Sequence, residues 1–135
     1  MSDIKWLDDK DTLIGALGIT ILPVKEGCYQ ARMKVDNRTC QNYGMLNGGA
    51  SLALAETLCG YASHLLCDSS HIPCGIQVSG NHLCKGKFGS TVTATARAVK
   101  TGKKVHVWDV KIKDEDDVLI SCVRVTNLIV EKSDN

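Results

Sequence analysis

Residues 48–66 form the longest apolar stretch of the chain, and Glu56 is the one charged side chain within it. Alanine, leucine, serine and glycine dominate the stretch, and Asn47 stands directly before it as a candidate N-cap residue. This composition predicts a helix over Gly48–Leu66 that is about 28 Å long. A helix with so few polar side chains cannot face water on all sides, so we expect a sheet to wrap around it.

Two segments before this helix have the patterns of strands. In residues 28–36, four apolar side chains occupy every second position and polar side chains stand between them. The apolar set is Tyr29, Ala31, Met33 and Val35. Residues 19–24 precede a turn at Gly27, so we expect them to pair with 28–36 as a hairpin.

The β-type pattern resumes after Pro73. Residues 91–99 are rich in threonine and valine, and 118–130 is long and β-branched. Between them, one apolar face is formed by His106, Trp108, Val110 and Ile112. Turns are expected at 100–103 and 114–117, which contain glycine or aspartate. Two strands, one buried helix and then four strands form an α+β pattern.

Composition limits the class of protein. The 135 residues suit a single domain, 1–135, in which 131–135 is a polar tail. A net charge of +1 and six scattered aromatic residues argue against nucleic-acid binding. The seven cysteines are odd in number and lack a CxxC pair, and Met1–Asp11 is charged rather than apolar, so we expect free thiols and a cytoplasmic location. No segment offers the roughly 20 consecutive apolar residues of a membrane span.

Glu56 is the strongest candidate for chemistry. One helical turn away it has only apolar or small neighbours, namely Leu52, Ala53, Cys59 and Gly60. Burying a carboxylate in such surroundings is costly, and buried ionisable groups often mark functional sites. We expect Glu56 to act in a pocket as a general base or a nucleophile. The alternative is a structural glutamate at a gap in the sheet.

The start of the predicted helix is a second candidate. Asn47, Gly48 and Gly49 open the helix with two residues that have no side chains. Free N–H groups and the positive end of the helix dipole could stabilise an oxyanion there. Gln41, six residues upstream of Asn47, could add a side-chain N–H. Alternatively, the glycines only permit close packing around the helix.

A cluster of lysines is a third candidate. Lys100, Lys103 and Lys104 flank the turn at Gly102, and Lys85 and Lys87 precede the neighbouring strand. Lysines beside a glycine turn suit phosphate binding, although solvated lysines are also common on edge strands.

Two other arrangements are weaker. His64, Cys67, His71 and Cys74 have spacings that could hold zinc, but Pro73 breaks the pattern and cysteines occur throughout the chain. A Cys–His nucleophile has no support from spacing alone. We expect no metal site.

The segment Gln41–Ser51 (QNYGMLNGGAS), followed by Ala55–Thr57, resembles the helix start of hotdog-fold acyl-CoA thioesterases. The resemblance is to the 4-hydroxybenzoyl-CoA, phenylacetate-pathway and 1,4-dihydroxy-2-naphthoyl-CoA types. It extends from Ile19 to Val130 and implies a long central helix wrapped by a six-stranded antiparallel sheet. One difference is that Asn47 stands where the family usually has histidine.

The resemblance also implies roles for individual residues. Glu56 would be the catalytic carboxylate, the Gly48 N–H would polarise the thioester carbonyl, and Gln41 would orient the thioester or the water. Asn47 would occupy the position of the family histidine. The residues implied to bind substrate or CoA are Gly49, Gly60, Asn81, His82, Lys103 and Lys104. No cofactor is implied beyond the CoA portion of the substrate.

The spacing of Gly48 and Glu56 argues for a dimer. Eight residues separate them, which is about 12 Å along one helix. A reacting carbonyl must lie about 3 Å from its oxyanion donor and within reach of its base. Two antiparallel helices from different chains can meet both requirements, so we expect an obligate homodimer with shared sites. The expected partners are an acyl-CoA and a second copy of the chain, and a dimer of dimers (homotetramer) is also expected.

The function expected from the sequence is hydrolysis of an aromatic or hydroxyaryl acyl-CoA thioester. The general-base and nucleophilic roles of Glu56 both stay open. The alternative function is a non-catalytic acyl-CoA-binding hotdog protein, for which Asn47 is the only indication. An isolated glutamate on an apolar helix argues against that alternative, because a binding protein gains nothing from a costly buried charge.

Overall fold

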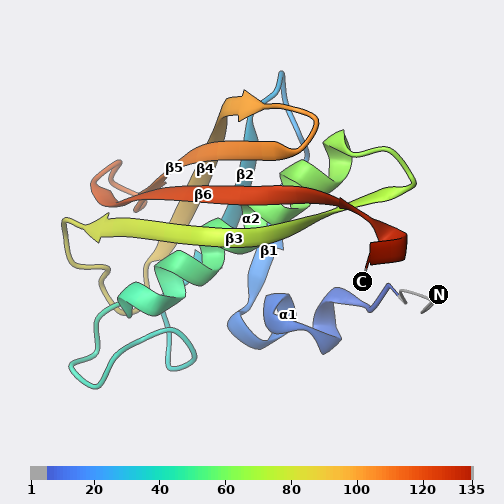
Figure 1. Ribbon diagram of the computed structural model, residues 1–135. Helices are drawn as coiled ribbons and strands as arrows, with labels where there is room; N and C mark the ends of the chain where they lie inside the picture. The colour runs from blue at the N-terminus through green and yellow to red at the C-terminus, as the bar shows by residue number, and fades with distance from the viewer. Residues whose placement is uncertain (1–5, 135) are drawn as a thin grey trace.

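Figure 1 shows the computed structural model, a six-stranded antiparallel sheet curled around one long helix; it describes residues 6–134. The strands are β1 (Ile19–Ile21), β2 (Tyr29–Lys34), β3 (His71–His82), β4 (Thr91–Thr101), β5 (Val105–Lys113) and β6 (Leu119–Glu131). The helices are α1 (Leu13–Leu17) and α2 (Gly48–Leu66), with 3₁₀ turns at Asp9–Asp11 and Lys132–Asp134. The predicted α+β class is confirmed.

Helix α2 begins and ends where the sequence predicts. Asn47 caps it, because its Oδ1 accepts the N–H of Gly49 at 2.7 Å. One side of α2 is buried against the sheet and carries Ala50, Ser51, Leu54, Ala55, Leu58, Cys59, Ala62 and Ser63. The other side is left outside the core, and this uncovered side contains Glu56.

The strands follow the order β1-β2-β4-β5-β6-β3, so β1 and β3 are the edges of the sheet. The predicted hairpin of β1 and β2 is present, with Ile19 opposite Met33. Trp108 and Ile112 of β5 point to the concave side and are fully buried, as the alternation predicts. Helix α2 packs against strands β2 to β6, and the edge strand β3 borders the uncovered side of the helix.

Two strand boundaries differ from prediction. β1 stops at Ile21 rather than reaching Val24, because Pro23 has no N–H to extend the ladder. β3 begins at His71, before Pro73, although the strand pattern was expected only after this proline. An edge strand tolerates proline, because one side of such a strand makes no ladder hydrogen bonds.

The chain ends also differ from prediction. Glu131 pairs with His71 and belongs to β6 rather than to a polar tail. Asn135 lies outside the described residues, and so do residues 1–5, the first part of the charged segment Met1–Asp11. The short helix α1 was not predicted, because five residues show no helical periodicity; it is capped by Thr12, whose Oγ1 accepts the N–H of Ile14.

A buried polar cluster joins α2 to the sheet. The Ser63 hydroxyl accepts hydrogen bonds from Trp108 Nε1 at 2.9 Å and from Asn127 Nδ2 at 3.0 Å. Asn127 Nδ2 also donates to the carbonyl of Cys59 at 3.1 Å. Since these donors fill both acceptor positions of the hydroxyl, its hydrogen must point to His106 Nδ1, which lies 2.8 Å away.

These hydrogen bonds determine the protonation state and the tautomer of His106. Its Nδ1 is an acceptor, so the ring is neutral and carries its hydrogen on Nε2. Burial lowers the pKa of His106 below its usual value of 6.5, and a backbone hydrogen bond with Gly102 acts in the opposite direction. A second ring proton would face the Ser63 hydroxyl, which has no acceptor position left.

The free energy of unfolding should therefore fall as pH decreases through about 6.5, the pKa of histidine in an unfolded chain. The unfolded state takes up a proton at His106 before the folded state does, so acid favours unfolding. Urea denaturation at pH 7.5 and pH 5.5 measures the change. His106→Asn keeps an acceptor for Ser63 but cannot titrate, so its decrease should be smaller. An equal decrease in both proteins would contradict the assignment.

Candidate active site

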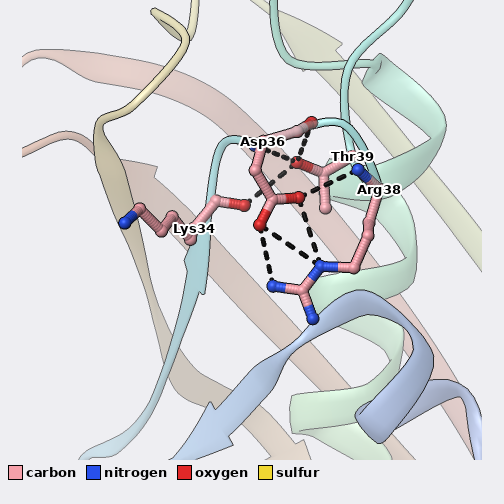
Figure 2. A network of polar contacts seen from close by, with 4 residues as sticks. All are labelled: Lys34, Asp36, Arg38 and Thr39. Atoms are coloured by element: carbon pink, nitrogen blue, oxygen red, sulfur yellow. Dashed lines mark hydrogen bonds and ion pairs between the residues drawn. The ribbon is translucent and has the colours of Figure 1, made fainter.

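A polar turn holds the loop that leads from β2 to α2, as Figure 2 shows. The Asp36 carboxylate accepts hydrogen bonds from the Arg38 backbone N–H at 2.9 Å and from its guanidinium at 2.7 Å. These bonds to Arg38 lower the pKa of Asp36. Thr39 Oγ1 donates to the carbonyl of Lys34 at 3.0 Å and accepts the N–H of Asp36 at 3.0 Å.

The same turn is tied to both helices. The Thr39 carbonyl accepts the N–H of Asn47 at 2.8 Å, which fixes the residue that caps α2. On the other side, the Arg38 guanidinium packs on Gly18, the residue that ends α1 with a φ of 67°. The positive φ favours glycine at this position, and a Cβ there would also push the Arg38 guanidinium aside, since it would lie 2.5 Å from it.

One backbone donor is free at the start of α2. The Gly49 N–H is taken by the Asn47 cap, and the N–H groups of Ala50 and Ser51 bond to the Asn47 carbonyl. Within residues 6–134, the Gly48 N–H has no hydrogen-bond partner. The cap thus leaves Gly48, rather than Gly49, as the donor that a ligand oxygen can reach.

His82 lies directly against Gly48. A Cβ built on Gly48 would be 2.5 Å from His82 Nε2 and 2.6 Å from His82 Cδ2. Close packing against His82 therefore favours glycine at position 48. Packing does not exclude a role in binding, because the Gly48 N–H has no partner within residues 6–134. At Gly49 the nearest atom to such a Cβ is Asn47 Oδ1, part of its own cap, at 3.1 Å.

Gln41 has its side chain fixed within the loop before α2. Its Oε1 accepts the N–H of Tyr43 at 2.6 Å, and its backbone exchanges hydrogen bonds with Met45 and Gly44. The side-chain oxygen is thus occupied, and the Nε2 hydrogens have no partner among the described residues. Gln41 can offer the side-chain N–H that the sequence suggested.

Glu56 is exposed in the single chain, and the expectation of a buried carboxylate was wrong for this state. Its Oε1 lies over Gly75 of β3, where a Cβ would be 3.3 Å from it. The register of β3 and β6 shifts between Gly75 and Gln77, which marks a bulge beside the carboxylate. An edge strand with a glycine at the bulge leaves Glu56 uncovered, and periodicity along α2 cannot report this.

Glu56 borders a cavity of about 760 Å³ between α1, β1, the start of β3 and the uncovered side of α2. Apolar side chains form most of its lining, including Ile14, Ile21, Tyr61, Ile72 and Pro73. Gly60 also lines it, and a Cβ there would meet no atom within 4 Å. The cavity is mainly apolar, and two carboxylates, those of Asp9 and Glu56, lie at its wall.

The predicted CoA-binding residues do not converge in one chain. Lys103 and Lys104 are exposed on the turn between β4 and β5, and Lys103 lines a cavity of about 540 Å³ with Cys67 and His71 near the C-terminal end of α2. His82 lies at the opposite end of α2. Asn81 faces the convex side of the sheet, where it lines a separate hollow with Asp109 and Arg124.

The other sequence candidates have local partners. His71 Nδ1 lies 2.8 Å from Asp68 Oδ1, and the His64 ring stacks on Trp6 at 4.8 Å. In the described part of the chain, no group of three or more histidine, cysteine, aspartate or glutamate residues is placed to hold a metal ion. None of the helices of residues 6–134 has the length and apolar character needed to span a membrane.

Three residues near the candidate site were not predicted from the sequence. Gly75 and Asn127 lie beside Glu56, and Ser121 contacts His82. A glycine inside a strand pattern can indicate a bulge, so Gly75 carried a usable signal. Asn127 and Ser121 did not, because polar residues that interrupt a mainly apolar strand face give no sign of which residue they contact.

Comparison with known proteins places these features in a family. The model of the thioesterase superfamily matches residues 43–121, which include all of α2. A 1,4-dihydroxy-2-naphthoyl-CoA hydrolase of Listeria monocytogenes is 34% identical over 116 residues, covering 86% of this chain and 94% of the relative.

Solved structures of thioesterases are also similar to this chain. A thioesterase of Pseudomonas aeruginosa has a TM-score of 0.88 and 36% identity, covering 91% of this chain and 88% of that one. A thioesterase of Staphylococcus aureus has a TM-score of 0.82 and 38% identity, covering 87% and 97%. The Staphylococcus protein has been solved with a glutamine replaced by alanine and, separately, with a glutamate fifteen residues later replaced by alanine. The chain therefore belongs to the thioesterase superfamily, and it is a thioester hydrolase with the hotdog fold.

Proposed function

We propose that this protein hydrolyses the thioester bond of acyl-CoA substrates and that Glu56 is its catalytic carboxylate. The observation that carries the proposal is the position of Glu56, the one acidic side chain of α2, at the wall of an apolar cavity. Gln41 and Glu56 have the same fifteen-residue spacing as the glutamine and glutamate replaced in the Staphylococcus aureus thioesterase, which supports roles for both.

The substrate proposed is an aromatic or hydroxyaryl acyl-CoA. The cavity beside Glu56 has apolar walls that include Tyr61, which suits a planar ring. The open space at Gly60 leaves room for a bulky acyl group next to the carboxylate. The Listeria monocytogenes relative named as a hydroxynaphthoyl-CoA hydrolase supports this class of substrate.

Two mechanisms fit a carboxylate in this position. As a general base, Glu56 takes a proton from water while the water oxygen attacks the carbonyl carbon, and the CoA thiolate leaves. As a nucleophile, Glu56 displaces the thiolate and forms a mixed anhydride, which water then hydrolyses. In either route the Gly48 N–H stabilises the carbonyl oxygen as it gains negative charge, and Gln41 orients the carbonyl or the water. No cofactor takes part in the proposed reaction.

The proposed site is shared between two chains. Glu56 and Gly48 lie on one rigid helix, about 12 Å apart, so one chain cannot bring both to the same carbonyl. The exposed edge of β3 offers a way to pair two copies. Antiparallel pairing of two β3 strands around Val78 would put Gly75, beneath Glu56, opposite Asn81 of the second copy. That register places His82 and Gly48 of the second copy close to Glu56.

The turn between β4 and β5 is proposed to bind the phosphates of CoA. Lys103 and Lys104 are exposed there, and Lys100 adds a third positive charge. The C-terminal end of α2 lies about 15 Å from Glu56 along the helix, a separation that the flexible pantetheine arm of CoA can bridge. The lysines thus act on the nucleotide end of the substrate and not on the thioester. We also propose that two such dimers associate as a homotetramer.

Replacing Glu56 with glutamine should lower kcat by at least about 100-fold, because the amide can neither take a proton nor attack the carbonyl. Release of free thiol from a panel of aliphatic, aryl and hydroxyaryl CoA esters measures this and also identifies the preferred acyl group. Thr57→Ser, at the neighbouring position, is the control and should keep its activity. Near-normal thiol release by folded Glu56→Gln protein would exclude Glu56 as the catalytic group.

The double variant Lys103→Ala, Lys104→Ala should have a higher KM for CoA esters and an unchanged KM for small thioesters that lack the nucleotide. The difference should shrink in high salt, because exposed charges are screened within about 8–10 Å. Lys25→Ala, Lys111→Ala is a control of equal charge change at exposed positions outside the lysine cluster. Equal losses on both kinds of thioester would instead show that the lysines support the fold.

Mixing two inactive variants tests the shared site. Gly48→Pro removes the N–H donor and displaces the His82 ring, and the extended conformation of Asn47 (ψ 132°) accepts a following proline. When Gly48→Pro and Glu56→Gln chains are unfolded together and refolded in equal amounts, half of the dimers are mixed. Each mixed dimer has one intact site, so activity should return to about a quarter of that of the wild type.

Each variant refolded alone is the control and should remain inactive. Mass spectrometry under native conditions establishes that mixed dimers have formed. A mixture that contains mixed dimers and still releases no thiol would show that the two halves of the site do not come from different chains.

A further inference from the structure

His82 and Ser121 stand directly opposite each other on β3 and β6. Nδ1 of the His82 ring lies 2.8 Å from the Ser121 hydroxyl oxygen. Ser121 is fully buried, whereas His82 is exposed. In this pair, an imidazole ring that is accessible to solvent is hydrogen-bonded to a hydroxyl group that is not.

The burial of Ser121 determines which ring nitrogen of His82 carries hydrogen. Within the described residues, Ser121 Oγ has His82 Nδ1 as its one hydrogen-bond partner. If Nδ1 donated the bond, the Ser121 hydrogen would be buried without an acceptor, which is unfavourable. If Ser121 donates, every polar group of the pair is satisfied. The neutral His82 ring then carries its hydrogen on Nε2.

Nε2 is the ring atom that lies beside Gly48. It would be 2.5 Å from a Cβ at Gly48, and a Cβ lies about 2.5 Å from its own backbone nitrogen, so Nε2 and the Gly48 nitrogen are within about 5 Å of each other. Two donors that each bind one oxygen at about 3 Å are separated by less than about 6 Å. The two nitrogens are therefore close enough to donate to the same oxygen atom.

We infer that Ser121 is a positioning residue that holds His82 in the Nε2–H form, so that His82 and Gly48 together donate to the thioester carbonyl oxygen. The inference rests on the proposed function of the site. It assigns His82 to the carbonyl end of the substrate, whereas resemblance alone implied a contact with CoA. It also supplies a second donor where Asn47 replaces the family histidine, since the Asn47 side-chain oxygen is committed to the helix cap.

Nitrogen-15 NMR of the histidine rings at pH 8, where an ordinary histidine is neutral, tests the tautomer in the unmodified protein. His82→Gln identifies the His82 signals. Two other histidines serve as internal references. His71 Nδ1 faces the Asp68 carboxylate and must carry hydrogen, whereas His106 Nδ1 accepts from Ser63 and must not. His82 should resemble His106. A His82 ring that resembles His71, or an even mixture of forms, would overturn the inference.

Ser121→Ala tests the consequence for catalysis. The His82 ring should shift toward a mixture of tautomers, and kcat should fall by about tenfold for CoA esters and for small thioesters alike, with KM little changed. Ser70→Ala is the matched control, because it removes an exposed hydroxyl that lies 3.0 Å from His71 Nδ1 and should leave the His82 signals in place. A rise of KM confined to CoA esters in His82→Gln would assign His82 to CoA binding and overturn the inference.

The outcomes separate this inference from the proposed function. If Glu56→Gln retains normal thiol release, the proposed function fails whatever the tautomer of His82. If Glu56→Gln is inactive but Ser121→Ala keeps both the wild-type kcat and the wild-type His82 signals, the function stands and the positioning role of Ser121 is wrong.

Discussion

The Ser63 hydroxyl ties helix α2 to strands β5 and β6 through three buried hydrogen bonds, and this junction sets the rotation of the helix. The apolar face of α2 packs against the sheet through side chains such as Leu54 and Leu58, and the hydrogen bonds of Ser63 add directional contacts that favour one rotation of the helix. Asn127 reinforces the junction through the Cys59 carbonyl. With the rotation fixed, Glu56 emerges at the edge of β3, above Gly75, rather than beneath the sheet.

Two buried serines of this protein each form a hydrogen bond with the Nδ1 atom of a histidine, and the two histidines differ in their surroundings. A buried serine fixes the hydrogen position of a histidine at Ser63 and His106, and the proposal for Ser121 and His82 has the same logic. His106 is buried on all sides, so its fixed form serves the fold. His82 presents its other nitrogen to the surface beside Gly48. The difference lies in what surrounds the second ring nitrogen, not in the serine–histidine pair itself.

Local sequence features predicted the local structure well. The bounds of α2, its Asn47 cap and the inward face of β5 depend on neighbouring residues alone, and all were predicted. The position of β3 at the edge depends on the order of strands, which no local pattern encodes, so its start at His71 and the exposure of Glu56 were missed. Gly48 and Glu56 could be singled out from the sequence, but the contact between Gly48 and His82 joins residues thirty-four positions apart.

Because Glu56 is exposed in the single chain, desolvation of its carboxylate does not oppose folding of that chain. A glutamate buried within one chain would oppose folding of that chain. Here the chain folds with Glu56 in contact with water, and an edge strand and an uncovered helix face lie beside it. If two copies pair along β3 as proposed, the carboxylate loses water only when the second chain brings its donors to the site. Desolvation of the carboxylate then opposes association of the two chains rather than folding of one chain. Hydrogen bonds along the β3 edge and burial of side chains such as Ile76 would offset it, and no isolated chain has a complete site.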